Sequence, residues 1–150
     1  MDYKTITLEE IRLIGIEART SNDDASDEIP HLWEQFFTEN IKDKIPNKIS
    51  SDILSLYTEY ESDYTKPYTI VLGCKVKDFS DVPEGMVSKI IPSSKFAVFT
   101  AKGKMPDELV NTWQYIWDSD LERTYTGDFD VYTEKYSSEV PEANVYVAIK

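Results

Sequence analysis

The chain contains an internal repeat, and this repeat strongly limits the folds that the sequence can adopt. The segment Tyr57–Glu59 recurs as Tyr132–Glu134, half of the 150-residue sequence further along. A repeat of this length indicates one supersecondary unit used twice. We therefore expect two copies related by a pseudo-two-fold axis, with the functional site at the seam between them. Further matches at the same or a similar spacing are Ser62 with Ser137, Lys75 with Lys150, and Trp33–Phe37 with Trp113–Trp117.

The composition is that of a folded domain. Hydrophobic residues make up 41% of the sequence and aromatic residues 13%, which argues against disorder. No apolar run approaches the roughly 20 residues that cross a bilayer, and the N-terminal segment lacks the apolar stretch of a signal peptide. The single cysteine, Cys74, rules out an internal disulfide. We therefore expect a cytoplasmic protein with no membrane association.

The charge balance argues against direct binding to nucleic acid. The chain carries 16 basic and 28 acidic residues, for a formal net charge of −12. Nucleic acid is held chiefly by Lys and Arg on its phosphates, and the sequence has no dense basic cluster. A negative field favours cationic or neutral ligands.

Each half of the sequence predicts the order strand, helix, strand, strand. In the first half, the expected helix has Asp27 as its N-cap and Pro30 in its first turn, and it ends at Pro46. The second helix opens at Pro106 and carries an apolar stripe that includes Trp113 and Trp117. The expected strands span 11–19, 53–61 and 68–76 in the first half, and 95–102, 129–136 and 144–149 in the second, with a short additional strand at 86–91.

These patterns predict a single domain over residues 1–150, with a first repeat at about 5–76, a linker at 77–85 and a second repeat at about 86–150. The fold class is α+β, with duplicated strand-helix-strand-strand modules. Joined side by side, the modules bury their sheet edges in one curved antiparallel sheet. We expect the helices on one face, while the other face needs cover from the linker, a partner or a ligand.

Several motifs resemble those of a known family. They are the segments 56–74, 113–117, 127–132 and 145–149, and they occur in the family's order and spacing. The chain resembles the GyrI-like small-molecule-binding superfamily, which includes the bacterial gyrase-inhibitory protein, the effector-binding domains of multidrug-responsive transcription activators and stand-alone integron-associated effector-binding proteins. The resemblance implies a duplicated fold with a ligand groove between the modules.

The resemblance also implies an acidic residue in that groove, within a Phe-Glu-x-Tyr motif. Here the motif is Phe129–Tyr132, so Asp130 replaces the usual glutamate. Because side chains alternate along a strand, Asp130, Tyr132 and Glu134 share one face. We expect Phe129 and Val131 to pack under the helices, which turns Asp130 and Tyr132 toward the groove. Desolvation in an aromatic cleft should raise the pKa of the carboxyl group.

The expected ligand-binding residues combine this motif with its counterparts in the first half and with neighbouring aromatic residues. For the tryptophans and tyrosines the alternative is ordinary packing, and for Glu59 it is a solvated position. We expect Trp33 and Phe37 to lie in the core. A lone His31 indicates no metal site, and no cofactor is expected. The ligand-binding residues are Asp130, Tyr132, Tyr57, Ser55, Glu59, Trp113, Trp117 and Phe96.

Three functions fit these features. The favoured one is a stand-alone effector-binding protein for small lipophilic or cationic compounds, with a role in transcription regulation or drug response. The first alternative is a hydrolase of electrophilic, cyclopropane-type xenobiotics, with Asp130 as the catalytic base and Tyr132 as the hydrogen-bond donor. The second alternative is a protein–protein module that inhibits DNA gyrase through its acidic surface. The expected protein partners are gyrase or a separate regulator.

Overall fold

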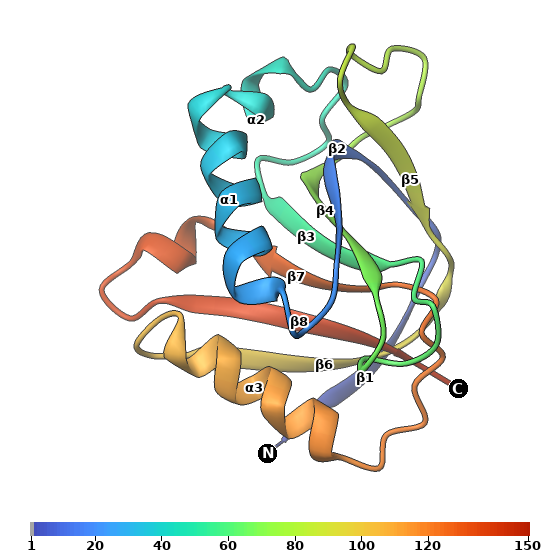
Figure 1. Cartoon of the computed structure of the whole chain (residues 1–150), viewed down its shortest axis with the longest axis vertical. Helices are drawn as coiled ribbons and strands as arrows, with labels where there is room; N and C mark the ends of the chain where they lie inside the picture. The colour runs from blue at the N-terminus through green and yellow to red at the C-terminus, as the bar shows by residue number, and fades with distance from the viewer. Residues whose placement is uncertain (1) are drawn as a thin grey trace.

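The fold is α+β, with helices on one face of a single curved sheet (Figure 1). The computed structural model describes residues 2–150, and only the backbone of Ala25 and Ser26. In this part of the chain eight strands form one open antiparallel sheet, which confirms the predicted fold class. The strands are β1 (Lys4–Leu8), β2 (Ile11–Thr20), β3 (Ile53–Thr58), β4 (Tyr68–Lys75), β5 (Val87–Ile91), β6 (Ser94–Lys102), β7 (Asp128–Tyr132) and β8 (Glu142–Ile149). The helices are α1 (Ala25–Thr38), α2 (Ile41–Lys44) and α3 (Asp107–Asp118), with a 3₁₀ turn η1 (Glu134–Ser137).

The strand order is symmetrical about the junction of β7 and β3. It runs β1-β6-β8-β7-β3-β4-β2-β5, so that β6, β8 and β7 match β2, β4 and β3. The outermost strands are exchanged between the halves, because β1 pairs with β6 while β5 pairs with β2. The β3–β7 pairing therefore forms the seam, and the exchanged edge strands tie the two halves together.

The first helical segment differs from its prediction. Asp24, not Asp27, occupies the N-cap position of α1, and Pro30 lies inside that helix. The helix ends at Thr38, well before Pro46, because Asn40 adopts a left-handed backbone with φ 51°. The single turn α2 fills the remaining distance.

Two strands are shorter than predicted at the seam. Strand β3 ends at Thr58 because Glu59 has a φ of 51°, which takes it out of the extended conformation. Strand β7 ends at Tyr132, and the Thr133 side chain accepts a hydrogen bond from the Lys135 backbone N–H to begin η1. Glu134 therefore lies in a 3₁₀ turn, and the expectation that it shares a strand face with Asp130 is wrong.

The helices cover one face of the sheet. Leu32 and Phe36 of α1 pack on Ile14, Ile70 and Leu72. In the other half, Ile116 of α3 packs on a separate cluster of Ala97, Phe99, Val145 and Val147. The helices thus lie over the two halves of the sheet, and the seam runs between them (Figure 1).

The opposite face is covered by the curvature of the sheet itself. A third cluster there draws residues from every strand, including Ile6 of β1 and Ile91 of β5 at the two edges. Phe129 and Val131 belong to this cluster, so the expectation that they pack under the helices is wrong. Their alternation with Asp130 holds, and it places that carboxylate on the face that bears the helices.

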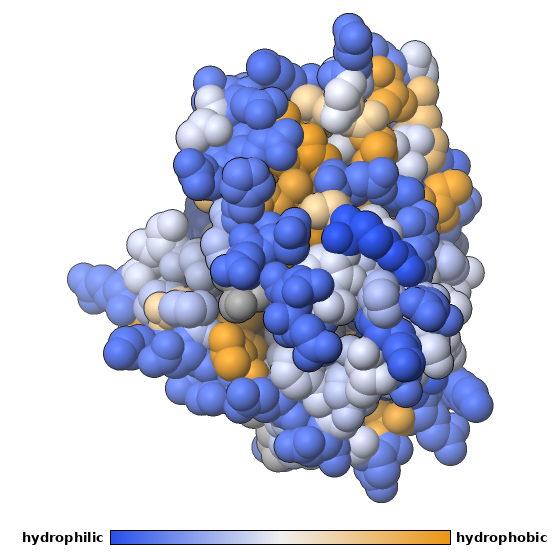
Figure 2. Space-filling view, viewed as in Figure 1, coloured by the Kyte–Doolittle hydropathy of each residue, from blue (hydrophilic) through white to orange (hydrophobic). Residues whose placement is uncertain are grey.

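The surface is mainly hydrophilic on the face shown in Figure 2, as the net charge of −12 leads one to expect. In residues 2–150, no helix is long and apolar enough to cross a membrane.

Candidate functional site

A cavity of about 780 Å³ lies over the seam, between α1 and α3. Its volume falls within the range of pockets that hold small organic ligands. Most of its wall is apolar and aromatic, and both repeats contribute. The lining residues are Asn22, Ile29, Pro30, Trp33, Phe37, Lys42, Ser51, Ile53, Tyr57, Tyr60, Tyr64, Tyr68, Pro106, Leu109, Val110, Trp113, Trp117, Arg123, Tyr132, Thr133, Glu134, Tyr136 and Ser137.

Asp130 lies beneath the aromatic floor of this cavity and has no exposed surface. Its Oδ2 accepts hydrogen bonds from the Tyr57 hydroxyl at 2.8 Å and from the Tyr132 hydroxyl at 3.5 Å. The indole Nε1 of Trp113 donates to Oδ1 at 3.0 Å. The carboxylate is therefore held by three aromatic donors, all of which also line the cavity.

Burial raises the pKa of Asp130 from its ordinary 3.8 to about 7. The hydrogen bonds from Tyr57, Trp113 and Tyr132 act in the opposite direction, because they favour the ionised form. Burial also raises the pKa of the Tyr57 hydroxyl, and the nearby Asp130 carboxylate raises it further. Near neutral pH the site can therefore hold either a charged or a neutral carboxyl group.

A second carboxylate, Asp128, lies two residues earlier on the same face of β7 and is also fully buried. Its Oδ2 accepts from the Tyr60 hydroxyl at 2.6 Å and forms an ion pair with the Arg123 guanidinium at 2.8 Å. The backbone N–H of Ala148 donates to Oδ1 at 2.8 Å. The sequence patterns did not predict that Asp128 is buried beside Asp130. The signal that could have found it is the i, i+2 spacing of Asp128 and Asp130 on one strand face.

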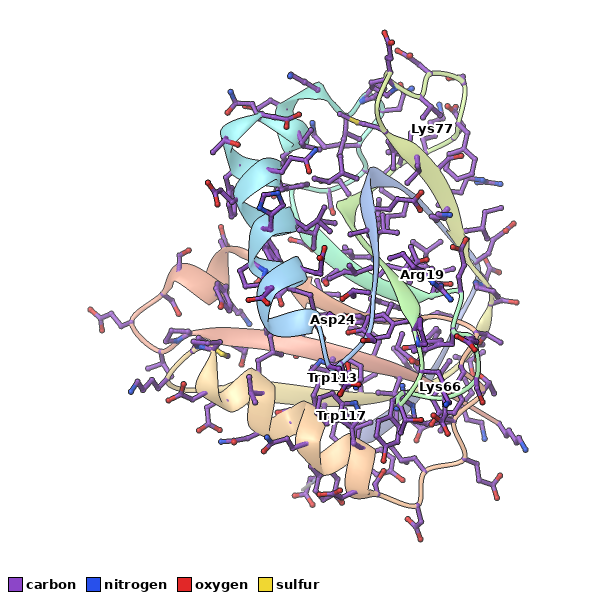
Figure 3. All side chains as sticks on the ribbon, viewed as in Figure 1. Arg19, Asp24, Lys66, Lys77, Trp113 and Trp117 are labelled. Atoms are coloured by element: carbon purple, nitrogen blue, oxygen red, sulfur yellow. The ribbon has the colours of Figure 1, made fainter. Side chains whose placement is uncertain are left out.

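Aromatic contacts shape the cavity wall. Tyr64 stacks on Trp117 with ring centroids 5.8 Å apart and planes at 8°, and Trp33 meets Tyr132 edge-on at 5.1 Å. Figure 3 shows Trp113 and Trp117 between α3 and the strands. Such rings offer flat apolar area and negative π faces, which attract cations.

The structure brings most of the predicted residues together. Tyr57, Tyr132, Trp113 and Trp117 line the cavity, and Asp130 lies under its floor. Ser55 is buried beside Asp130 in the seam but does not line the cavity.

Two predicted residues lie elsewhere. Glu59 is exposed and forms an ion pair with Lys89 at 2.7 Å, because its backbone has left the strand. Phe96 is fully buried against Phe129 on the opposite face of the sheet. The alternation of side chains along a strand divides them between two faces, but it does not identify the face on which the site lies. Neither Glu59 nor Phe96 lines the cavity over the seam.

Some cavity residues were not predicted as such. Trp33 and Phe37 were expected in the core, yet both line the cavity, because an apolar helical stripe looks the same in either setting. The tyrosines of the β3–β4 connection gave no periodic signal, since they lie in a polar loop. Within residues 2–150 no cluster of His, Cys, Asp and Glu residues suited to a metal ion is found.

Comparison with known proteins places this architecture in a family. The model of the family Cass2, described as integron-associated effector binding protein, matches residues 5–149. The chain belongs to the Cass2 family of effector-binding proteins. This agrees with the GyrI-like resemblance of its motifs, and it makes the cavity over the seam the natural candidate for the effector site.

One relative and two solved structures are similar to this chain. YobU of Bacillus subtilis (strain 168), named as a candidate transcriptional regulator, is 33% identical over an alignment of 162 positions, which covers 100% of this chain and 99% of YobU. The integron cassette protein VCH_CASS2 from the mobile metagenome of Vibrio cholerae has a TM-score of 0.75 at 24% identity, with 99% of this chain and 95% of that chain covered. SAV2435, solved bound to tetraphenylphosphonium, has a TM-score of 0.84 at 18% identity, with 100% and 94% covered. The two solved structures show the same fold.

Proposed function

We propose that this Cass2-family chain is a binding protein for lipophilic aromatic cations, which it holds in the cavity between its two repeats. The observation that carries the proposal is the buried Asp130 carboxylate under a cavity floor of aromatic donors. Aromatic walls supply area and cation–π attraction of about 0.5–2 kcal/mol per contact. A carboxylate in a site of low dielectric supplies the charge complement.

The structural neighbour SAV2435 supports this choice of ligand, since it was solved with tetraphenylphosphonium bound. That ion has four phenyl rings around one positive centre, which suits a cavity of about 780 Å³ walled by aromatic side chains. The Tyr57 and Tyr132 hydroxyls are held by Asp130 at the cavity floor. The Asp130 carboxylate therefore attracts a bound cation across the two tyrosine hydroxyls, or contacts it directly once these hydroxyls have moved aside.

The test is a titration with tetraphenylphosphonium and with tetraphenylborate, which has the same shape and the opposite charge. Quenching of tryptophan fluorescence reports occupancy, because Trp33, Trp113 and Trp117 all line the cavity. We expect saturable binding of the cation and at least about tenfold weaker binding of the anion, as one favourable charge contact implies. The variant Asp130→Asn should narrow this difference. Equal binding of the two ions to the wild-type protein would contradict the proposal.

A role in transcription regulation would then pass through a partner. The full-length relative YobU is named as a candidate regulator, but the net charge of −12 does not suit contact with DNA. We propose that ligand occupancy is communicated to a separate protein. A ligand-dependent pull-down supports this route, and direct binding of the purified chain to DNA in a mobility-shift assay would contradict it.

The hydrolase hypothesis requires the Asp130 carboxylate to reach a water molecule or the substrate. A general base must lie within hydrogen-bond reach of the proton that it removes, whereas Asp130 is fully buried and already accepts three hydrogen bonds. Catalysis therefore requires the Tyr57 and Tyr132 hydroxyls to move aside. Recovery of the unchanged ligand after incubation supports binding, and turnover that is lost in Asp130→Asn supports hydrolysis.

A further inference from the structure

One charged side chain of the cavity wall, the guanidinium of Arg123, has incomplete hydrogen bonds. Its side chain is only 4% exposed and lines the cavity wall. The residue lies in the connection between α3 and β7, where an isolated bridge to Ile149 fixes its backbone against β8. The side chain is therefore held in place by the fold.

Only one edge of this guanidinium is used by the protein. Its Nη2 donates to Asp128 Oδ2 at 2.8 Å. Among residues 2–150, Nε and Nη1 find no acceptor, and both atoms are buried. Buried donors are nearly always paired, and leaving one unpaired costs about 1–3 kcal/mol. Neither atom has accessible surface, so an acceptor that enters the cavity reaches them only after the Arg123 side chain or a covering ring shifts. The two unpaired donors make such a shift favourable when an acceptor is present.

The neighbouring groups do not remove this need. The guanidinium lies 4.4 Å from the Tyr125 ring centroid and 5.9 Å from that of Trp113. These rings attract the positive charge, but they do not replace an oxygen acceptor for each N–H. Asp128 is already occupied by Tyr60 and the Ala148 backbone in addition to Arg123. The ion pair thus holds Arg123 in position while its remaining donors stay free.

Asp130 and Arg123 both contact one indole, that of Trp113. Trp113 donates from Nε1 to Asp130, and its ring also lies beside the Arg123 guanidinium. Asp130 and Asp128, the partner of Arg123, are two residues apart on β7, which corresponds to about 7 Å along a strand. Arg123 and the donors that cover Asp130 therefore belong to the same part of the cavity wall.

We infer that Arg123 is a ligand-binding residue that receives a hydrogen-bond acceptor, preferably a carboxylate, on the same aromatic molecule whose cationic end faces Asp130. The inference rests on the proposed function and narrows its ligand class from lipophilic cations to aromatic zwitterions. Arginine suits this role because its planar fork matches a carboxylate. This preference opposes the overall field of the protein, since a net charge of −12 disfavours an added negative group.

The test compares two ligands that differ only at the end of one chain. One is a triphenylphosphonium with a carboxybutyl chain, and the other is a triphenylphosphonium with a pentyl chain of the same length. We expect the wild-type protein to bind the carboxylate form about tenfold more tightly, which is the effect of one charge-assisted hydrogen bond. Equal binding, or tighter binding of the pentyl form, would overturn the inference.

The matched variant replaces both members of the ion pair, Arg123→Met with Asp128→Asn. It leaves the net charge unchanged and avoids an unpaired buried Asp128. It should lose the preference for the carboxylate, so that the ratio of the dissociation constants of the two compounds falls to about one. The variant Arg123→Lys keeps a cation beside Asp128 without the planar fork, and it should lose most of the preference. Retention of the full preference in both variants would overturn the inference.

Tetraphenylphosphonium separates the two proposals, because it carries no acceptor for Arg123. If it binds but the carboxylate gives no advantage, the proposed function stands and the Arg123 inference fails. If tetraphenylphosphonium does not bind but the carboxybutyl compound binds and requires Arg123, the Arg123 inference stands. In that case the proposal that simple lipophilic cations are the ligands fails. If neither compound binds, both proposals fail.

Discussion

Ser55 and Asp130 lie directly opposite each other across the seam of β3 and β7. They are equivalent positions of the two repeats, half of the 150-residue sequence apart, and their neighbours pair symmetrically around them, Leu54 with Val131 and Leu56 with Phe129. The pseudo-two-fold axis therefore passes between a hydroxyl and a carboxylate. The fold is duplicated, but the charge at its centre is not.

A second carboxylate at this axis should destabilise the protein. In Ser55→Asp two acidic groups would share one dry site, and like charges there raise the pKa of at least one of them. We expect a loss of about 2–4 kcal/mol in unfolding free energy near pH 7.5, measured by urea denaturation, with a smaller loss near pH 5. Ser55→Ala is the control. It should be neutral or slightly stabilising, because the buried Ser55 Oγ has no hydrogen-bond partner in residues 2–150. A stable, pH-independent Ser55→Asp variant would contradict this account.

The raised pKa of Asp130 predicts a stability cost that depends on pH. Between the ordinary value of 3.8 and the folded value of about 7, the unfolded state has released its proton and the folded state has kept it. Stability therefore falls as pH rises through this window and is constant above it. Asp130→Asn removes this dependence, so the variant should exceed wild type by up to about 4 kcal/mol near pH 8 and by little near pH 4. Urea denaturation at several pH values measures the difference, and a gap that does not widen with pH would refute the assignment.

The same titration should control the binding of cations. Below about pH 7 the Asp130 carboxyl is largely neutral, so the affinity for tetraphenylphosphonium should fall by up to tenfold per pH unit. The other groups around it are the Tyr57, Tyr132 and Trp113 donors and the Asp128 carboxylate, which is paired with Arg123. Calorimetric titrations between about pH 5.5 and pH 8 give the profile. Asp130→Asn should give a flat and weak profile, whereas a wild-type profile without a transition would exclude Asp130 as the charge that is sensed.

Trp113 and Trp117 form a matched pair for testing the floor of the cavity. Trp113→Phe removes the Nε1 donor that favours the ionised form of Asp130. The midpoint of the binding profile should therefore move upward, by about one pH unit. Trp117→Phe replaces the indole that stacks on Tyr64 with a smaller ring, so it should weaken binding without moving the midpoint. Equal shifts in both variants would show that the hydrogen bond from Trp113 is not what tunes Asp130.

Sequence patterns located the floor of the site because the repeat and the strand alternation both act there. Tyr57, Asp130 and Tyr132 lie on regular strand next to the symmetry axis, where each pattern supports the other. Glu59 does not follow this alternation, because its own backbone has a positive φ and strand β3 ends at Thr58.

The remaining differences have a common physical origin in tertiary structure. Trp33 belongs to an apolar helical stripe that is typical of core residues, yet it lines the cavity. Such a stripe shows that a helix face contacts apolar groups, but it does not distinguish a packed core from a ligand cavity. Arg123 lies in a polar connection with no periodicity, and its partner Asp128 is reached only through the fold. Phe96 packs in the cluster on the face opposite the helices, and strand alternation alone does not identify the face that the helices cover.

Gly15 and Gly73 are paired across β2 and β4, and their missing side chains allow the two strands to approach closely. A Cβ atom on Gly15 would overlap the Leu72 carbonyl oxygen, and one on Gly73 would overlap the carbonyl oxygen of Ile14. Backbone atoms cannot move aside as a flexible side chain can, so Gly15→Ala should cost about 3 kcal/mol or more and lower the melting temperature by roughly 10 °C. Gly85→Ala is the control, because its Cβ would meet no atom within 4 Å and only its φ of 84° opposes the change. A Gly15→Ala variant that melts within about 2 °C of wild type would show that the strands can separate here at little cost.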